Sequence, residues 1–166
     1  MKKYIAIFSL LLANIAFAQK KRPNILIINV DDWGWRDAGF MGSKYYETPV
    51  MDALVKQGTI FTNGYASASN CAPSRASMLS GLWQTRHGIY TVSNSDRGKS
   101  INRKLVPTTN NETLDPKFKI FPAVLKENGY TTCIAGKWHM SNDPMPYGFD
   151  VNIGGSHAGH PGSYYP

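Results

Sequence analysis

The chain has 166 residues, a length that fits a single domain. Its formal net charge of +7 suits an anionic ligand. The basic residues do not gather in one stripe, so binding to nucleic acid is not indicated. The sequence has no internal repeat, low-complexity tract or heptad pattern, which excludes solenoid and coiled-coil architectures.

The N-terminus has the layout of a secretory signal peptide. Met1–Lys3 is basic, Tyr4–Ala13 is almost wholly apolar, and Ala16–Ala18 is a small-x-small cleavage site. The apolar run is too short to cross a bilayer as a stable helix, so we expect no membrane anchor. An ordinary buried helix is the alternative interpretation. The sequence therefore predicts a signal peptide over residues 1–18 and a mature, secreted or periplasmic chain over residues 19–166.

Three apolar runs predict strands, and they cover residues 24–30, 60–66 and 130–135. The first run, Asn-Ile-Leu-Ile-Ile-Asn-Val, is almost continuously apolar and branched, which is typical of a strand buried on both faces of a parallel sheet. The second run is weaker, and the third again reads as a buried strand.

Three further segments predict helices. The first begins at Thr48-Pro49, where threonine serves as a cap and proline takes the first helical position, and it ends at Gly58. The other two cover residues 74–80 and 121–127, and a glycine lies close behind each of them.

The remaining segments are irregular. Residues 84–116 are polar and predict a long surface loop, and the tail from Ser141 predicts no regular element. The order of strands and helices is typical of the α/β class. Three strands make a thin parallel sheet, which requires helices on both faces.

Two adjacent carboxylates, Asp31 and Asp32, follow the first predicted strand directly. Ligands bind beyond the carboxyl ends of strands in open α/β sheets, so this pair lies where a site is expected. In a turn, both side chains can converge on a hard divalent cation, although such an ion takes six to eight oxygens. A solvated acidic turn is the alternative interpretation.

The motif with the highest information content is Cys71-Ala-Pro73-Ser74-Arg75, at the start of a predicted helix. Cysteine counting alone favours a disulfide between Cys71 and Cys133 in an exported chain. A structural disulfide does not require proline and arginine at fixed offsets, so the motif favours a chemical role for Cys71.

Three segments occur here in the order in which sulfatases have them: residues 24–32, the cysteine motif at 71–75, and residues 129–139. The last segment reads Gly-Tyr-Thr-Thr-Cys-Ile-Ala-Gly-Lys-Trp-His. Together they resemble the N-terminal portion of the formylglycine-dependent sulfatases, in the alkaline-phosphatase-like superfamily, over essentially all of residues 19–166. The resemblance implies part of an α/β sandwich with a mostly parallel central sheet and flanking helices.

The resemblance also implies a reaction. Cys71 is converted to formylglycine, whose hydrate attacks the sulfur of a sulfate ester, and the second hydroxyl then drives release of sulfate. Arg75 orients the formylglycine, Lys137 binds sulfate and neutralises developing charge, and His139 hydrogen-bonds the nucleophilic hydroxyl. Lys137 and His139 lie two residues apart, so they share one side of an extended segment.

The resemblance further implies partners and a cofactor. One Ca²⁺ is held by Asp31, Asp32 and the modified residue 71, and a formylglycine-generating enzyme matures the chain. Export and the basic charge together favour a sulfated glycan as substrate, a sulfated polysaccharide or oligosaccharide.

Other polar and aromatic residues have no assigned role. Three histidines are interpreted as loop residues or substrate contacts: His87, His157 and His160. Four aromatic residues follow the aspartates and either stack on sugar rings or join the core: Trp33, Trp35, Tyr45 and Tyr46.

The family pattern is incomplete before Pro166. Sulfatases draw a further aspartate–asparagine pair, a histidine and a lysine from later sequence, and these residues have no counterpart here. We therefore expect a truncated chain with an incomplete site, in which turnover can be lost. The alternatives are a phosphonate or phosphate ester hydrolase of the same superfamily, and a catalytically dead remnant that binds an anion or a glycan.

Overall fold

A computed structural model describes residues 22–165. The chain divides into two units, Met1–Val30 and Asp31–Pro166. The predicted signal peptide lies outside the described residues. Among the described residues, no helix has both the length and the apolar character that a membrane span requires.

The described part of the first unit is an extended segment without secondary structure. The strand predicted over residues 24–30 is therefore not formed, and its side chains are exposed, as Leu26 (84%) and Ile28 (69%) illustrate. A strand of this composition needs neighbouring strands and covering helices, and no described strand pairs with it. The apolar pattern therefore indicates a strand that is not formed among the described residues.

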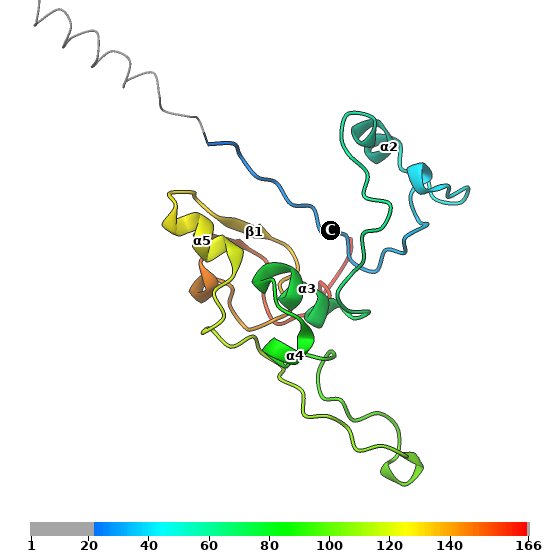
Figure 1. Ribbon diagram of the computed structural model, residues 1–166, viewed down its shortest axis with the longest axis vertical. Helices are drawn as coiled ribbons and strands as arrows, with labels where there is room; N and C mark the ends of the chain where they lie inside the picture. The colour runs from blue at the N-terminus through cyan, green and yellow to red at the C-terminus, as the bar shows by residue number, and fades with distance from the viewer. Residues whose placement is uncertain (1–21, 166) are drawn as a thin grey trace, which may run out of the picture. The chain divides into compact units, whose positions relative to one another are not determined.

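The second unit contains all three predicted helices (Figure 1). They are α2 (Pro49–Val55), α3 (Cys71–Ser80) and α5 (Phe121–Glu127). Proline stands in the first turn of α2 and α5, where its missing N–H has no helical partner to lose. The prediction for α2 was too long, because the helix ends at Val55 and a turn leads to Gly58.

Shorter helical segments complete the unit: the α-helix α4 (Gln84–His87) and the 3₁₀ helices η1 (Gly39–Met41), η2 (Ser100–Asn102) and η3 (Met145–Tyr147). Both α4 and η2 lie within residues 84–116, which are otherwise the surface loop that the composition predicts. Asn110 fastens this loop, because its Oδ1 accepts hydrogen bonds from the backbone N–H groups of Tyr90 (2.7 Å) and Thr91 (3.2 Å).

The sheet of the second unit has two parallel strands, β1 (Cys133–Ala135) and β2 (Val151–Ile153), with Cys133 opposite Val151. Only the last three residues of the predicted strand 130–135 form β1. The preceding Thr132 instead joins the loop before β2, since its carbonyl accepts the N–H of Asp150 at 2.9 Å. The sequence did not predict β2, which is a three-residue run in a tail rich in glycine and proline.

The strand predicted over residues 60–66 was wrong. A turn interrupts it, in which Gly64 N–H donates to the Phe61 carbonyl at 3.4 Å. Phe61 is 82% exposed, so no packing compensates for the loss of extended pairing.

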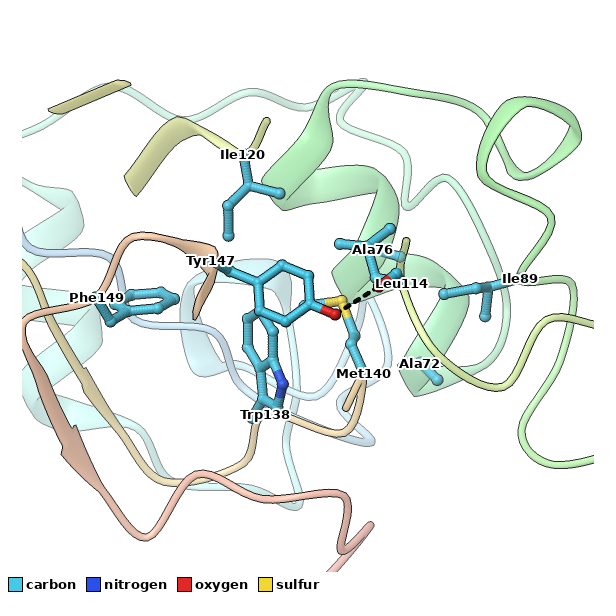
Figure 2. Close-up of a cluster of buried hydrophobic side chains, with 9 residues drawn as sticks. All are labelled: Ala72, Ala76, Ile89, Leu114, Ile120, Trp138, Met140, Tyr147 and Phe149. Carbon is cyan, nitrogen blue, oxygen red and sulfur yellow. Dashed lines mark hydrogen bonds between the residues drawn. The ribbon is translucent and has the colours of Figure 1, made fainter. Parts of the chain in front are cut away.

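The core of the second unit is a cluster of nine buried apolar side chains (Figure 2): Ala72, Ala76, Ile89, Leu114, Ile120, Trp138, Met140, Tyr147 and Phe149. Tyr147 stacks obliquely on Trp138, with ring centroids 5.2 Å apart, and its hydroxyl donates to the Leu114 carbonyl. Burial raises the pKa of Tyr147, which keeps this hydroxyl protonated as a donor. The core therefore joins α3 to the segment that follows β1.

His87 belongs to this interior, and its interpretation as a loop residue or substrate contact was wrong. It ends α4 and is 1% exposed. The Ile89 N–H donates to His87 Nδ1 at 3.1 Å, so Nδ1 is unprotonated and Nε2 carries the hydrogen that points to Ser77 Oγ at 3.0 Å. The neutral ring thus ties α4 to the buried side of α3.

Gly148 supplies a first test of this packing. Its φ is +102°, and an added Cβ would lie 2.6 Å from the Ala123 Cβ and 2.7 Å from the Ala123 N in α5. Gly42 is a matched control, because its φ is +93° and an added Cβ meets nothing within 4 Å. We expect Gly148→Ala to lower the free energy of unfolding by about 1–3 kcal/mol more than Gly42→Ala. Denaturant unfolding of both variants measures the difference, and equal losses would contradict the close packing on α5.

His87 supplies a second test. Burial lowers the pKa of His87 below its ordinary value of 6.5. The unfolded chain therefore binds a proton at a higher pH than the folded chain, and stability falls as the pH drops below about 6.5. In His87→Gln this component of the pH dependence should vanish, although the variant is less stable at neutral pH. Urea midpoints between pH 5 and 8 test this, and an unchanged slope in His87→Gln would refute the assignment.

Candidate active site

Helix α3 places Cys71 and Arg75 one turn apart on the same face. Its opposite side is buried through four residues, Ala72, Pro73, Ala76 and Ser77, so the Cys71 face points away from the core. Cys71 is the first residue of the helix and follows the N-cap Asn70, whereas the sequence placed it just before the helix. Backbone N–H groups without helical partners surround this position and favour an anion there.

The guanidinium of Arg75 connects α3 to two distant segments. Its Nη1 donates to the Lys137 carbonyl at 2.6 Å, and its Nη2 donates to Asp31 Oδ1 at 3.3 Å. The third guanidinium nitrogen, Nε, is buried and has no partner among the described atoms. Arg75 therefore fixes the geometry of the site and leaves its Nε–H available.

Asp31 is shared by two cations. Lys137 Nζ donates to Asp31 Oδ2 at 2.5 Å, while the Arg75 guanidinium contacts Oδ1. Partial burial raises the pKa of Asp31, but the hydrogen bonds and positive charges of Lys137 and Arg75 outweigh it and hold the pKa below its ordinary value. The structure thus gathers Asp31, Arg75 and Lys137, three predicted site residues that are far apart in sequence.

His139 lies close to this cluster in a strained backbone conformation. Its φ is +66°, a left-handed value that costs free energy for a residue other than glycine and that is often found at functional sites. Its N–H donates to the Ser156 carbonyl at 2.8 Å, and its buried Nδ1 has no partner within residues 22–165. Burial lowers the pKa of His139, and the positive charge of Lys137 lowers it further, so the ring is neutral at pH 7.

The predicted metal ligands are not assembled into a metal site. Asp32 is exposed with a φ of +52°, and no group of three or more histidine, cysteine, aspartate or glutamate side chains in the described residues could hold a metal. Chemically, the carboxylates of Asp31 and Asp32 fit part of a Ca²⁺ site, since that ion prefers charged oxygen ligands. Two carboxylates do not complete its coordination.

The two cysteines are both free, which contradicts the alternative of a disulfide. Cys71 is half-buried and Cys133 is exposed on β1. The aromatic residues after the aspartates are mostly exposed: Trp35 is 70% exposed, Tyr45 85% and Tyr46 51%. These three are therefore not core residues.

The sequence indicated His157 and His160 as loop residues or substrate contacts, but it did not predict that their segment lies against His139. Residues 154–160, here called the strap, pass against His139, and the His157 and His139 rings lie 6.2 Å apart. His160 is exposed and its Nδ1 lies 2.9 Å from the Pro161 carbonyl. The glycines at 154, 155 and 159 are the only sequence signal for such a close approach.

The sequence and the structure both match known sulfatases. The sulfatase family profile matches residues 23–161. The human N-acetylgalactosamine-6-sulfatase is 34% identical over 146 residues, which are 86% of this chain and 27% of that protein. A sulfatase of Formosa agariphila is 36% identical over 174 residues, covering 92% of this chain and 31% of that protein.

Solved structures are also similar to this chain. Ps i-CgsB is 34% identical with a TM-score of 0.65, and the match covers 81% of this chain and 29% of that one. It has also been solved in complex with k-i-k-neocarrahexaose, which gives a TM-score of 0.59 at 33% identity, over 75% of this chain and 27% of that one. A protein from Bacteroides thetaiotaomicron, solved in work on the metabolism of multiple glycosaminoglycans, has a TM-score of 0.65 at 29% identity, over 80% of this chain and 28% of that one.

The matched part is a minor share of each relative, since the chain spans about 30% of their length. Within that share the fold is the N-terminal part of the alkaline-phosphatase-like α/β architecture, as the sequence predicted. A profile match over most of the chain, together with relatives above 30% identity, leaves one conclusion: this chain belongs to the sulfatase family.

Proposed function

We propose that this chain supplies the nucleophile and the anion-binding cations of a sulfatase that releases sulfate from a sulfated glycan. The observation that carries the proposal is the contact of Arg75, one turn from Cys71, with both Asp31 and the Lys137 backbone. The names of the relatives support a glycan, because they include an N-acetylgalactosamine-6-sulfatase and a protein solved with a carrageenan-type oligosaccharide. The net charge of +7, which becomes +5 once Lys2 and Lys3 leave with the signal peptide, also suits a polyanion.

The reaction begins at residue 71, where the cysteine sulfur stands in for the aldehyde hydrate of formylglycine. One hydroxyl oxygen of the hydrate forms a bond to the ester sulfur, and the bond from sulfur to the alcohol oxygen breaks. The alcohol leaves with a proton, which balances the proton that the attacking hydroxyl gives up. The second hydroxyl then loses its proton, the carbon–oxygen bond to the sulfate breaks, and the aldehyde reforms. Addition of water restores the hydrate, so the net reaction consumes one water molecule per ester.

Arg75 and Lys137 supply the positive charge that this reaction requires. The ester sulfate is anionic, and negative charge builds on its oxygens as the bond to the alcohol breaks. The buried Nε–H of Arg75, which has no partner in the described residues, can donate to one of these oxygens or to the hydrate. Lys137 contributes the positive charge of its ammonium group. Because its side chain is only 17% exposed, solvent ions screen this charge weakly.

His139 handles a proton in this proposal. Because its pKa is lowered, the imidazole is neutral at pH 7 and can accept a proton from the nucleophilic hydroxyl. The buried Nδ1 is the atom that lacks a partner, which supports its assignment to this transfer.

Ca²⁺ is the proposed cofactor, held by Asp31, Asp32 and an oxygen of the modified residue 71. When bound, it would act as a Lewis acid that stabilises negative charge on oxygen. Other oxygens must complete its coordination. Export by the signal peptide at residues 1–18, a secreted or periplasmic location and maturation by a formylglycine-generating enzyme are part of the same proposal.

The decisive experiment compares a substitution of Cys71 with a substitution of Cys133. The full chain is co-expressed with a formylglycine-generating enzyme. The peptide that contains residue 71 should then be about 18 Da lighter than the same peptide with an unmodified cysteine. This chain should release sulfate from N-acetylgalactosamine 6-sulfate. Cys71→Ala should lower the rate by about a thousandfold or more. Cys133→Ser, which changes the exposed cysteine on β1, should leave the rate intact. Sulfate release that survives Cys71→Ala, or faster hydrolysis of the matched phosphate ester, would refute the proposal.

A substitution of Asp32 tests the proposed Ca²⁺ site. Asparagine tolerates the left-handed backbone of this residue as well as aspartate does, so Asp32→Asn removes a charge without new backbone strain. The Ca²⁺ concentration needed for half-maximal sulfate release should rise, because the affinity of such sites depends on the number of charged ligands. Asp37→Asn, in the neighbouring turn, serves as the control for loss of a nearby carboxylate. Equal calcium requirements in Asp32→Asn and the wild type would remove Asp32 from the site.

A further inference from the structure

The strap, residues 154–160, has a defined conformation. Asn152 clamps its start, because Oδ1 accepts the N–H of Gly155 at 2.7 Å and Nδ2 donates to the carbonyl of the same residue at 2.9 Å. Gly155 is buried, and a Cβ added there would lie 3.4 Å from the Trp138 Cβ. The strap is thus anchored on β2 at one side and on the core at the other.

The strap contacts the imidazole of His139 directly. A Cβ at Gly159 would lie 3.0 Å from both Cε1 and Nε2 of His139, a tight contact that would require the ring to shift by a few tenths of an ångström. The Ser156 carbonyl accepts the His139 N–H, which fixes the two backbones to each other. A side chain between these two contacts is therefore held near His139.

His157 is that side chain. Its ring meets the His139 ring edge to face, with an interplanar angle of 74°. His139 is 7% exposed, whereas His157 is exposed, so His157 is the member of the pair that solvent and a ligand can reach. The two ring centroids lie 6.2 Å apart, so the rings are direct neighbours.

We propose that His157 contacts the carbohydrate part of the bound substrate and so favours glycan sulfates over small aryl sulfates. This inference rests on the proposed function. In this proposal the reacting sulfate group lies with Arg75, Lys137 and His139, and the alcohol that carries it extends toward solvent. His157, next to His139 and exposed, can hydrogen-bond a sugar hydroxyl or pair with a second sulfate.

The first test measures binding, so it does not depend on turnover. The full chain is expressed without a formylglycine-generating enzyme, and binding of N-acetylgalactosamine 6-sulfate is measured by calorimetry. His157→Ala should weaken binding by about fivefold to tenfold, the effect of one lost hydrogen bond to a ligand. His157→Gln keeps a hydrogen-bonding amide and should recover part of the affinity. Ser163→Ala, in the tail beyond the strap, should bind as the wild type does, because its hydroxyl hydrogen-bonds to the backbone of Tyr165.

The second test measures selectivity in the matured chain. The ratio of kcat/KM for N-acetylgalactosamine 6-sulfate to kcat/KM for 4-nitrophenyl sulfate should fall by about fivefold in His157→Ala, mainly through KM. A purely structural role of His157 would lower both values together and leave the ratio unchanged, which would overturn the inference.

The experiments distinguish a failure of the proposed function from a failure of the inference about His157. A wild-type chain that releases no sulfate contradicts the proposed function, while the binding test still decides the role of His157. Equal affinity of His157→Ala and the wild type, an equal loss in Ser163→Ala, or no binding of the sugar sulfate by the wild type would each overturn the inference.

Discussion

The second unit depends on one interaction, the guanidinium of Arg75 between the Lys137 carbonyl and the Asp31 carboxylate. It connects α3, the segment after β1 and the turn that begins the unit. Lys137 closes the arrangement through its own ion pair with Asp31. Because the side chain of Arg75 is 11% exposed, water competes weakly for these contacts, and the arrangement is stronger than a surface salt bridge. The cations that would meet a sulfate are therefore positioned before any ligand arrives.

The core and the site share the same elements. The back of α3 packs through Ala72 and Ala76, while its front presents Cys71 and Arg75. Trp138 is fully buried between the two predicted site residues Lys137 and His139, so a core side chain fixes their positions. The strained φ of His139 follows from this arrangement, since its backbone must turn from the core toward the Ser156 carbonyl.

Local signals in the sequence were sufficient for the helices and for the family. Proline at a first turn and glycine behind a last turn marked α2, α3 and α5, and the motif around Cys71 marked the family. The strands were harder, because pairing depends on partners that are distant in sequence. The apolar run at 24–30 has no partner in the described structure, and β2 is too short to give a pattern. The burial of His87 and the contact of the strap with His139 were missed because both follow from tertiary packing.

The free thiols have a consequence for how the chain behaves in an oxidising compartment. If residue 71 is matured, the chain retains a single sulfhydryl, Cys133, on an exposed strand position. An odd sulfhydryl cannot close an internal bridge and can form a disulfide only with another molecule. The immature polypeptide, with two sulfhydryls, takes up two equivalents of a maleimide under denaturing conditions, and the mature one takes up one. Simple stoichiometric labelling thus reports the extent of maturation in any preparation.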